Sequence, residues 1–157
     1  MLAYPPAMVW PWSRSKRILG KAQEAELVDA IRRAESGNRG EVRIHLEYTC
    51  EGGNALSRAR LLFARLGMRR TAKDTGVLLY VAVKDRQAAV YAGRGVHGAA
   101  LPGFWQEVVD LVAKGFREDA AVPGLVSAVE RIGELLRTAA PGLDVAGNEL
   151  PDQVSQS

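Results

Sequence analysis

The sequence predicts an α/β protein, a three-layer α/β/α sandwich around a small mixed sheet, and three observations lead to this class. Residues 76–83 form an apolar run between turn residues, which is typical of a strand buried on both faces. Two further strand patterns flank this run, and apolar residues at helical spacing precede and follow them. A strand–helix–strand unit makes neighbouring strands parallel, so helices have to cover both faces of the sheet.

The composition indicates one globular domain, which we place over residues 16–140. Of the 157 residues, 47% are hydrophobic and 25% are charged, with a formal net charge of +3. The arginines are scattered along helix faces, so nucleic-acid binding is not expected. The single cysteine, Cys50, excludes an intramolecular disulfide and a multi-cysteine zinc site. Because no apolar run approaches the roughly 20 residues of a membrane-spanning helix, we expect no transmembrane segment. The first charge, Arg14, follows the N-terminal apolar stretch, which is the wrong order for a secretory signal, so we expect a cytoplasmic location.

Both ends of the chain are expected to lie outside this domain. Residues 1–15 are predicted to be an irregular arm, because prolines interrupt its hydrophobic stretch. Residues 141–157 show no helical or strand period and carry several acidic residues, which predicts a disordered tail. An alternative for the arm is association with a membrane surface, through Trp10 and Trp12 and the basic residues Arg14, Lys16 and Arg17.

The first helix and the first strand follow from two different periods. Apolar residues at helical spacing predict a helix over residues 17–35, ended by a glycine- and asparagine-containing turn. Residues 41–48 alternate between apolar and polar side chains, which predicts a strand with one wetter face, away from the centre of the sheet. We expect His45 to be solvated there or paired with a carboxylate. The wetter face consists of Glu41, Arg43, His45 and Glu47.

The remaining elements complete the two helical layers. A turn at residues 51–54 leads into a helix over residues 55–66. The short link at residues 84–87 joins the central strand to a strand at 88–92, which predicts an antiparallel hairpin. Apolar stripes over residues 105–116 and 125–136 predict two closing helices.

This topology brings polar residues together at one edge of the sheet. The first and central strands are parallel and begin at Glu41 and just after Asp74, whereas the third strand runs back and ends at Gly93. The opposite edge, at the carboxyl ends of the parallel strands, is where ligands usually bind. It contains residues 50–54 and 84–86 but no convergent carboxylates, so we rank it second. The preferred edge holds Glu41, Lys73, Asp74, Thr75 and the loop 93–98.

Residues 93–98 match the pattern G-x-G-x-x-G but not its dinucleotide-binding context. The pattern requires its last glycine to open a helix whose amides face the pyrophosphate. Here Pro102 and Gly103 would break any helix that began at Gly98 within a few residues, so nucleotide binding is not expected. His97 in this loop is a candidate ligand or proton carrier, although a lone exposed histidine is the commoner outcome.

Three segments in order resemble the TPM-domain family, long described as a phosphatase domain, which includes a thylakoid-lumen protein of photosystem II repair. The resemblance implies an α/β/α sandwich with a Rossmann-like sheet. It also implies a divalent-cation site, often for calcium, lined by acidic residues, and weak phosphatase activity in some members. The matching segments are residues 31–45, residues 59–82 and residues 90–105, within a total span of roughly 20–140.

The resemblance assigns positions to this cation site. Asp74 and Glu41 match acidic family positions, while Thr75 stands where the family commonly has asparagine. Arg94 occupies the place of an acidic residue in the glycine-rich loop. Calcium takes six to eight oxygen ligands, so this replacement predicts a degraded site in which Asp74 pairs with Arg94 instead. The same edge then favours a small anion such as phosphate, through Arg69, Arg70, Lys73 and Arg94.

Two functions follow as expectations. The first is a non-catalytic TPM-type module that acts through an unknown protein partner or by binding a small ion. The alternative is a weak divalent-metal-dependent phosphatase, in which Glu41 and Asp74 hold the cation and Arg94 binds the phosphate. In either case the ligand-binding loop is expected to comprise Gly93, Arg94, Gly95 and His97, with Lys73 beside it.

Overall fold

The computed structural model describes residues 18–71, 73–142 and 154–157. Within these ranges the predicted helices and strands occur in the predicted order. The structure adds a 3-10 turn at residues 68–70, a short helix at residues 94–97 within the expected loop 93–98, and a strand at the end of the chain. The elements are α1 (Lys21–Glu35), β1 (Glu41–Glu47), α2 (Ala55–Arg65), the 3-10 turn η2 (Met68–Arg70), β2 (Gly76–Ala82), β3 (Gln87–Ala92), α3 (Arg94–His97), α4 (Phe104–Arg117), α5 (Ala121–Ala139) and β4 (Val154–Gln156).

The sheet is mixed and has the order β3-β2-β1-β4. β1 and β2 are parallel, in the register Glu41 to Gly76, and β2 and β3 form the predicted antiparallel hairpin. β4 is parallel to β1 on its other side. β1 and β2 therefore begin together at one end of the sheet and finish together at the other. One of the two polar clusters described below lies at each of these ends.

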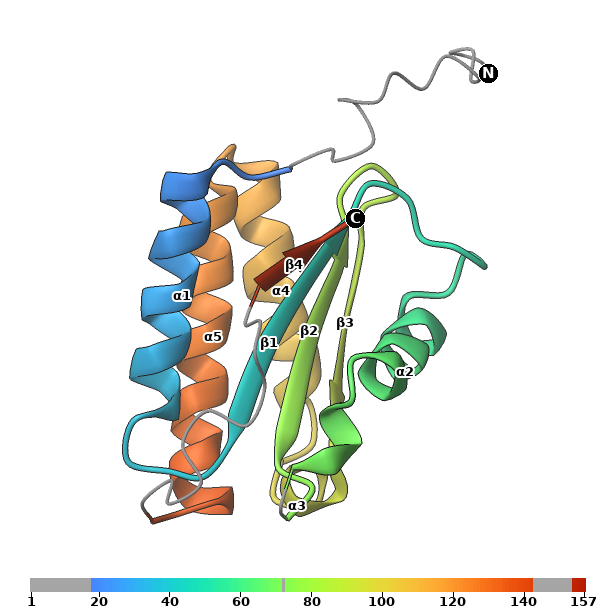
Figure 1. Cartoon of the computed structure of the whole chain (residues 1–157). Helices are drawn as coiled ribbons and strands as arrows, with labels where there is room; N and C mark the ends of the chain where they lie inside the picture. The colour runs from blue at the N-terminus through green and yellow to red at the C-terminus, as the bar shows by residue number, and fades with distance from the viewer. Residues whose placement is uncertain (1–17, 72, 143–153) are drawn as a thin grey trace.

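Helices cover both faces of this sheet, which confirms the three-layer α/β/α prediction. Figure 1 shows α1, α4 and α5 on one face and α2 on the other. β2 divides its side chains between two apolar clusters, because successive strand residues point to opposite faces. Leu79 belongs to the cluster under α1, α4 and α5, and Leu78 belongs to the cluster under α2. Every residue of β2 is buried, as the apolar run predicted.

The prediction that β1 has a wetter face away from the centre of the sheet is wrong. β1 lies between β2 and β4, and all seven of its residues are buried. The alternation is real, but the polar side chains are enclosed rather than solvated. The buried polar residues of β1 are Glu41, Arg43, His45 and Glu47.

The prediction of a disordered tail is wrong for residues 154–157. These residues form β4 and continue its pairing, because the backbone N–H of Ser157 donates to the carbonyl oxygen of Leu46 at 2.9 Å. The predicted arm at residues 1–15 lies outside the described residues, as do residues 143–153 of the predicted tail. No helix in the described part of the chain is both long enough and apolar enough to cross a membrane.

Candidate functional site

The turn that leads into β2 holds Asp74 in a defined position. The backbone N–H of Thr75 donates to Oγ1 of Thr71 at 3.1 Å, and the N–H of Asp74 donates to the carbonyl oxygen of Thr71 at 3.2 Å. Oγ1 of Thr75 in turn donates to the carbonyl oxygen of Arg39 at 2.9 Å. Asp74 has a φ of 54°, in the left-handed region that aspartate enters more readily than most residues. The turn is thus fixed from both sides.

Two glycines allow the short helix α3 to approach this turn. A Cβ atom at Gly93 would lie 2.2 Å from the carbonyl oxygen of Asp74, and one at Gly95 would lie 2.4 Å from that of Lys73. The N–H of Gly95 donates to the carbonyl oxygen of Asp74 at 2.9 Å. The first two glycines of the G-x-G-x-x-G pattern therefore serve backbone packing.

The pairing expected between Asp74 and Arg94 is present. Oδ2 of Asp74 accepts hydrogen bonds from Nε of Arg94 at 3.2 Å and from the backbone N–H of Arg94 at 3.1 Å. Oδ1 of Asp74 is buried and has no hydrogen-bond partner among the described residues. The Arg94 side chain is 96% exposed, so its guanidinium keeps donors free for a ligand from solvent.

An open pocket of about 950 Å³ surrounds this pair, on the side of the sheet that α2 covers. Three of its lining side chains are cationic, Arg69, Lys73 and Arg94, and one is anionic, Asp74. The pocket therefore carries a positive balance of charge. Its full lining is Phe63, Arg69, Thr71, Lys73, Asp74, Tyr91, Ala92, Gly93, Arg94 and Gly95.

Only part of the predicted site gathers at this pocket. Glu41 and Thr75 are buried beside the pocket without lining it, and the N–H of Glu41 donates to the carbonyl oxygen of Thr75 at 3.2 Å. His97 does not line the pocket either; its ring stacks on Trp105, with ring centroids 6.5 Å apart. The members that do gather are Lys73, Asp74, Gly93, Arg94 and Gly95.

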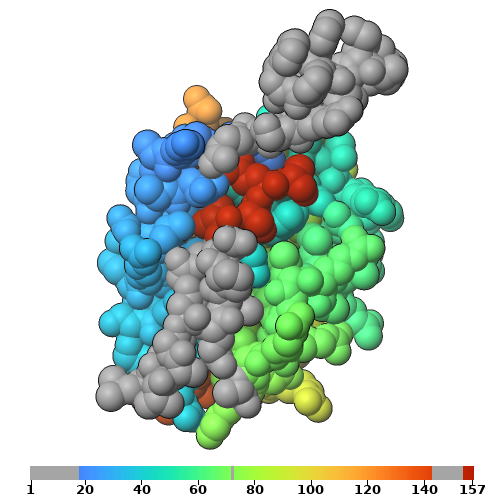
Figure 2. All heavy atoms as spheres, viewed as in Figure 1, coloured from blue at the N-terminus to red at the C-terminus, as the bar shows by residue number. Residues whose placement is uncertain are grey.

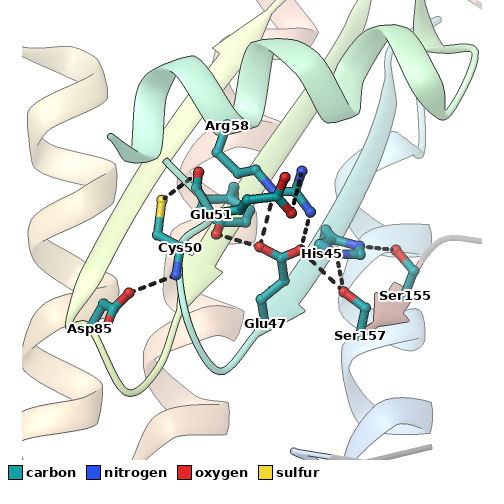
Figure 3. Close-up of polar contacts among 9 residues, drawn as sticks. His45, Glu47, Cys50, Glu51, Arg58, Asp85, Ser155 and Ser157 are labelled. Carbon is teal, nitrogen blue, oxygen red and sulfur yellow. Dashed lines mark hydrogen bonds and ion pairs between the residues drawn. The ribbon is translucent and has the colours of Figure 1, made fainter. Parts of the chain in front are cut away.

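A second polar cluster lies at the opposite edge of the sheet and centres on Glu47, the last residue of β1. The Glu47 carboxylate accepts hydrogen bonds from Nε of Arg58 at 3.1 Å and from the Tyr80 hydroxyl at 2.6 Å, and Nη2 of Arg58 also binds it. Ser157 donates to it from β4 at 3.2 Å. Figure 3 shows Arg58, His45 and Ser157 converging on this carboxylate.

Burial and polar partners together set the charges of Glu47 and His45. Burial alone raises the pKa of Glu47, but the hydrogen bonds from Arg58 and Tyr80 hold this pKa below its usual value. Burial lowers the pKa of His45, although the nearby Glu47 carboxylate opposes this shift at an Nε2–Oε1 distance of 3.6 Å. Burial and the hydrogen bond to Glu47 raise the pKa of Tyr80. The cluster therefore contains an ionised carboxylate beside a histidine that favours its neutral form.

The second cluster was not predicted from the sequence, because no convergent carboxylates were expected at this end of the strands. Glu47 and Glu51 both lie near Arg58, with Glu51 at 3.9 Å, and Oδ2 of Asp85 accepts the N–H of Cys50 at 2.7 Å. One feature of the sequence did indicate it. Polar residues alternate along β1, next to a strand that is wholly apolar and therefore buried, so the polar side chains of β1 are expected to be buried too and to form hydrogen bonds.

Comparison with known proteins identifies the family. The family model for the TPM domain matches residues 13–135. The chain belongs to the TPM-domain family. This TPM domain is also similar to the solution structure of the BA42 protein from the psychrophilic bacterium Bizionia argentinensis. The two share 33% identity and a TM-score of 0.79, over 90% of this chain and 97% of that one.

Two more distant structures show the same fold. The N-terminal domain of a protein from P. gingivalis matches with a TM-score of 0.63 at 20% identity, over 77% of this chain and 78% of that one. The N-terminal domain of the cg2496 protein from Corynebacterium glutamicum matches with a TM-score of 0.60 at 8% identity, over 76% of this chain and 74% of that one. No functionally curated protein matches the TPM domain described here.

Proposed function

We propose that this TPM domain is a non-catalytic module that binds a small oxyanion, such as phosphate, in the pocket at Asp74 and Arg94. One observation carries the proposal: three cationic side chains line the pocket, and Arg94 already neutralises its one carboxylate at 3.2 Å. An oxyanion gains charge-assisted hydrogen bonds from such groups. Because Arg94 is exposed, water screens its charge and we expect weak binding, with a Kd on the order of 1 mM.

The side chains in the pocket support binding rather than catalysis. Hydrolysis of a phosphate ester needs a nucleophile or a positioned base near the phosphorus atom. Thr71 carries the hydroxyl in the pocket closest to the Asp74 turn, and this oxygen is engaged by the carbonyl of Met68 and the N–H of Thr75. Among the described residues that line the pocket there is no histidine, cysteine or serine.

A metal-dependent phosphatase is the second candidate, and one observation favours it. Oδ1 of Asp74 is buried without a hydrogen-bond partner among the described residues, as an oxygen reserved for a cation would be. Calcium, however, takes six to eight oxygen ligands. No group of three or more His, Cys, Asp or Glu side chains in the described part of the chain is placed to hold a metal ion. The residues at Asp74 do not fit a calcium ion on their own.

Two-dimensional NMR titrations of EDTA-treated protein with sodium phosphate and, separately, with calcium chloride distinguish these candidates. With phosphate up to about 10 mM, we expect saturable shifts confined to the amides of Lys73, Asp74 and residues 93–95. Arg94→Ala should weaken phosphate binding by about fivefold or more, roughly 1 kcal/mol. Arg33→Ala removes an equal charge from an exposed site on α1 and should leave binding unchanged.

Asp74→Asn separates the two candidates by the sign of its effect. Asparagine keeps the size of aspartate and tolerates the left-handed backbone, but it removes the negative charge. An oxyanion should bind this variant more tightly, whereas a cation should bind it more weakly. Saturable calcium shifts at the same amides, lost in Asp74→Asn and without any phosphate response, would reject the oxyanion proposal.

A further inference from the structure

The last four residues of the chain occupy the outer edge of β1. Val154, Ser155 and Gln156 pair with Ile44, His45 and Leu46 in a parallel ladder. Figure 2 shows residues 154–157 at the surface beside α1. Only Val154 of this segment packs against the apolar core, and it is partly buried. The segment is therefore held mainly by backbone pairing and by polar side chains.

Both the oxygen and the nitrogen of the Gln156 side-chain amide form hydrogen bonds on the α1 side of the sheet. Its Oε1 accepts the backbone N–H groups of Ile18 at 2.6 Å and Leu19 at 2.9 Å. Its Nε2 donates to the carbonyl oxygen of Leu19 at 3.3 Å and to Oε2 of Glu24 at 2.9 Å. Glutamate in this place offers no donor and faces the Glu24 carboxylate. The site therefore selects an amide.

The two serines point to the opposite face, as the pleat of a strand requires. Oγ of Ser155 lies 2.7 Å from Nδ1 of His45, and Oγ of Ser157 lies 3.0 Å from Nε2 of the same ring. His45 and Glu47, which contact the two serines, are also held by residues outside β4. Arg58 and Tyr80 hold Glu47, and the His45 ring stacks over that of Tyr80 with centroids 6.3 Å apart.

We propose that the outer edge of β1 is a recognition site for an extended polypeptide with the pattern apolar–hydroxyl–amide–hydroxyl. Residues 154–157 occupy this site within the chain, and a partner protein carrying the pattern displaces them by adding its own strand to the sheet. Backbone pairing supplies affinity in this mode, while the Gln156 and serine positions supply specificity.

Displacement is feasible because the uncovered surface is mainly polar, apart from the core contact of the partly buried Val154. Departure of β4 exposes one strand edge, the His45 ring, part of the Glu47 carboxylate and the backbone of Leu19, all of which water can solvate. Departure of β3 would instead expose the apolar side chains of β2. His45 and Glu47 stay in place, since Arg58 of α2 and Tyr80 of β2 contact them, and the Leu19 side chain is anchored in the apolar core. This proposal goes beyond the oxyanion site, which lies at the other end of β1.

Amide hydrogen exchange on the unmodified protein tests whether the segment opens on its own. The Ser157 amide, which donates to Leu46, should exchange at least about 100-fold faster than the amides of the β1–β2 ladder, after correction for intrinsic rates. Local opening of β4 alone explains such a difference. Equal protection at both places means that β4 leaves only on global unfolding and overturns the proposal.

A fluorescent peptide with the sequence of residues 152–157 tests binding from outside. It should bind the full chain carrying Gln156→Ala at least about tenfold more tightly than the unmodified chain, whose own segment competes at high effective concentration. NMR shifts should map to Leu19 and residues 44–46. The same peptide carrying Gln156→Glu is the matched control and should bind at least about tenfold more weakly, because it loses the donor to Glu24.

Two outcomes overturn the proposal. One is the absence of saturable binding to the Gln156→Ala chain at millimolar peptide, together with unchanged β1 amides. The other is a concentration-dependent dimer of the unmodified chain that disappears with Gln156→Ala, since the edge then exchanges segments between copies rather than binding a separate partner.

Discussion

At the scale of single residues, Glu47 shows what a charged side chain needs in order to be buried in this domain. A carboxylate taken from water loses several kcal/mol of solvation unless other groups replace it. The Arg58 guanidinium supplies two hydrogen bonds and an opposite charge, and the Tyr80 hydroxyl supplies a third bond. The pKa of Glu47 stays below its usual value despite burial, which shows that these partners outweigh the loss of water.

Arg58→Met should therefore destabilise the protein strongly. Methionine keeps the aliphatic stem but leaves the Glu47 charge buried with fewer partners, and such a change costs about 3–5 kcal/mol. Urea denaturation measures the loss in the free energy of unfolding. Arg60→Met, at an exposed position of the same helix, is the control and should change stability by at most about 0.5 kcal/mol. Equal effects of the two variants would contradict the central place given to the Glu47–Arg58 pair.

Individual site residues differed in how far the sequence could predict them. The Asp74–Arg94 pairing could be predicted because both residues lie next to strand ends that the apolar runs mark clearly. The Glu47 cluster could not, because an alternating strand looks the same whether its polar face meets water or a buried arginine. Arg58 lies on a helix, where its direction depends on how α2 packs over β2 and β3.

At the scale of elements, the position of α3 depends on two backbones in direct contact. Gly93 lies at the end of β3, and its N–H donates to the carbonyl oxygen of Gly76 at 2.8 Å. The absence of a Cβ atom lets the start of α3 lie against the Asp74 turn. Any side chain at Gly93 has to move either the helix or the turn, because a backbone carbonyl cannot rotate away as a side chain can.

Gly93→Ala should cost about 1–3 kcal/mol of stability and disturb the pocket. The added methyl group would lie 2.2 Å from the carbonyl oxygen and 2.5 Å from Oδ1 of Asp74. Thermal unfolding measures the cost, and amide shifts at residues 73–75 report the displacement. Gly98→Ala is the matched control in the same segment, since no atom lies within 4 Å of its added Cβ and its φ is −69°. A neutral Gly93→Ala would mean that α3 is not held by this close approach.

Elements with their own apolar period could be predicted, and β4 could not. Helices α1, α2, α4 and α5 carry an apolar period, β1 alternates, and β2 is an uninterrupted apolar run, whereas the four residues of α3 carry no period and were expected to form a loop. β4 has three residues, two of them polar, and its place comes from partners distant in the chain. The Gln156 side chain, for example, binds Leu19. Such long-range contacts cannot be predicted from the local sequence, and a short polar segment of this kind is predicted to be disordered.

At the scale of the whole molecule, the Glu47 cluster links four segments of the fold through polar contacts rather than through either apolar core. Its members come from β1, β2, α2 and the end of the chain, whereas each apolar cluster fills one side of the sheet. Protonation inside this cluster should therefore affect global stability. His45 is the group expected to respond first as the pH falls, because its usual pKa lies closest to neutrality.

The free energy of unfolding should fall as the pH drops below 6.5. The unfolded chain binds a proton on His45 near the usual pKa of 6.5, whereas burial lowers the pKa of this group in the folded state. Above pH 6.5 both states hold neutral His45, and the group makes no contribution to pH dependence. Between 6.5 and the lower folded-state pKa, unfolding takes up a proton, so acid favours unfolding. Glu47 causes a second loss in the free energy of unfolding below pH 4.5, because folding also lowers its pKa from the usual value of 4.5.

His45→Gln should flatten this dependence between pH 7 and about 5 while leaving the loss at lower pH. Glutamine cannot titrate, and its amide can still bond the hydroxyls of Ser155 and Ser157. The measurement is urea denaturation at several pH values, and the slope against pH is compared rather than the stability at one pH. Parallel curves for His45→Gln and the unmodified protein would show that His45 stays accessible to protons in the folded state, contrary to its burial between β2 and β4.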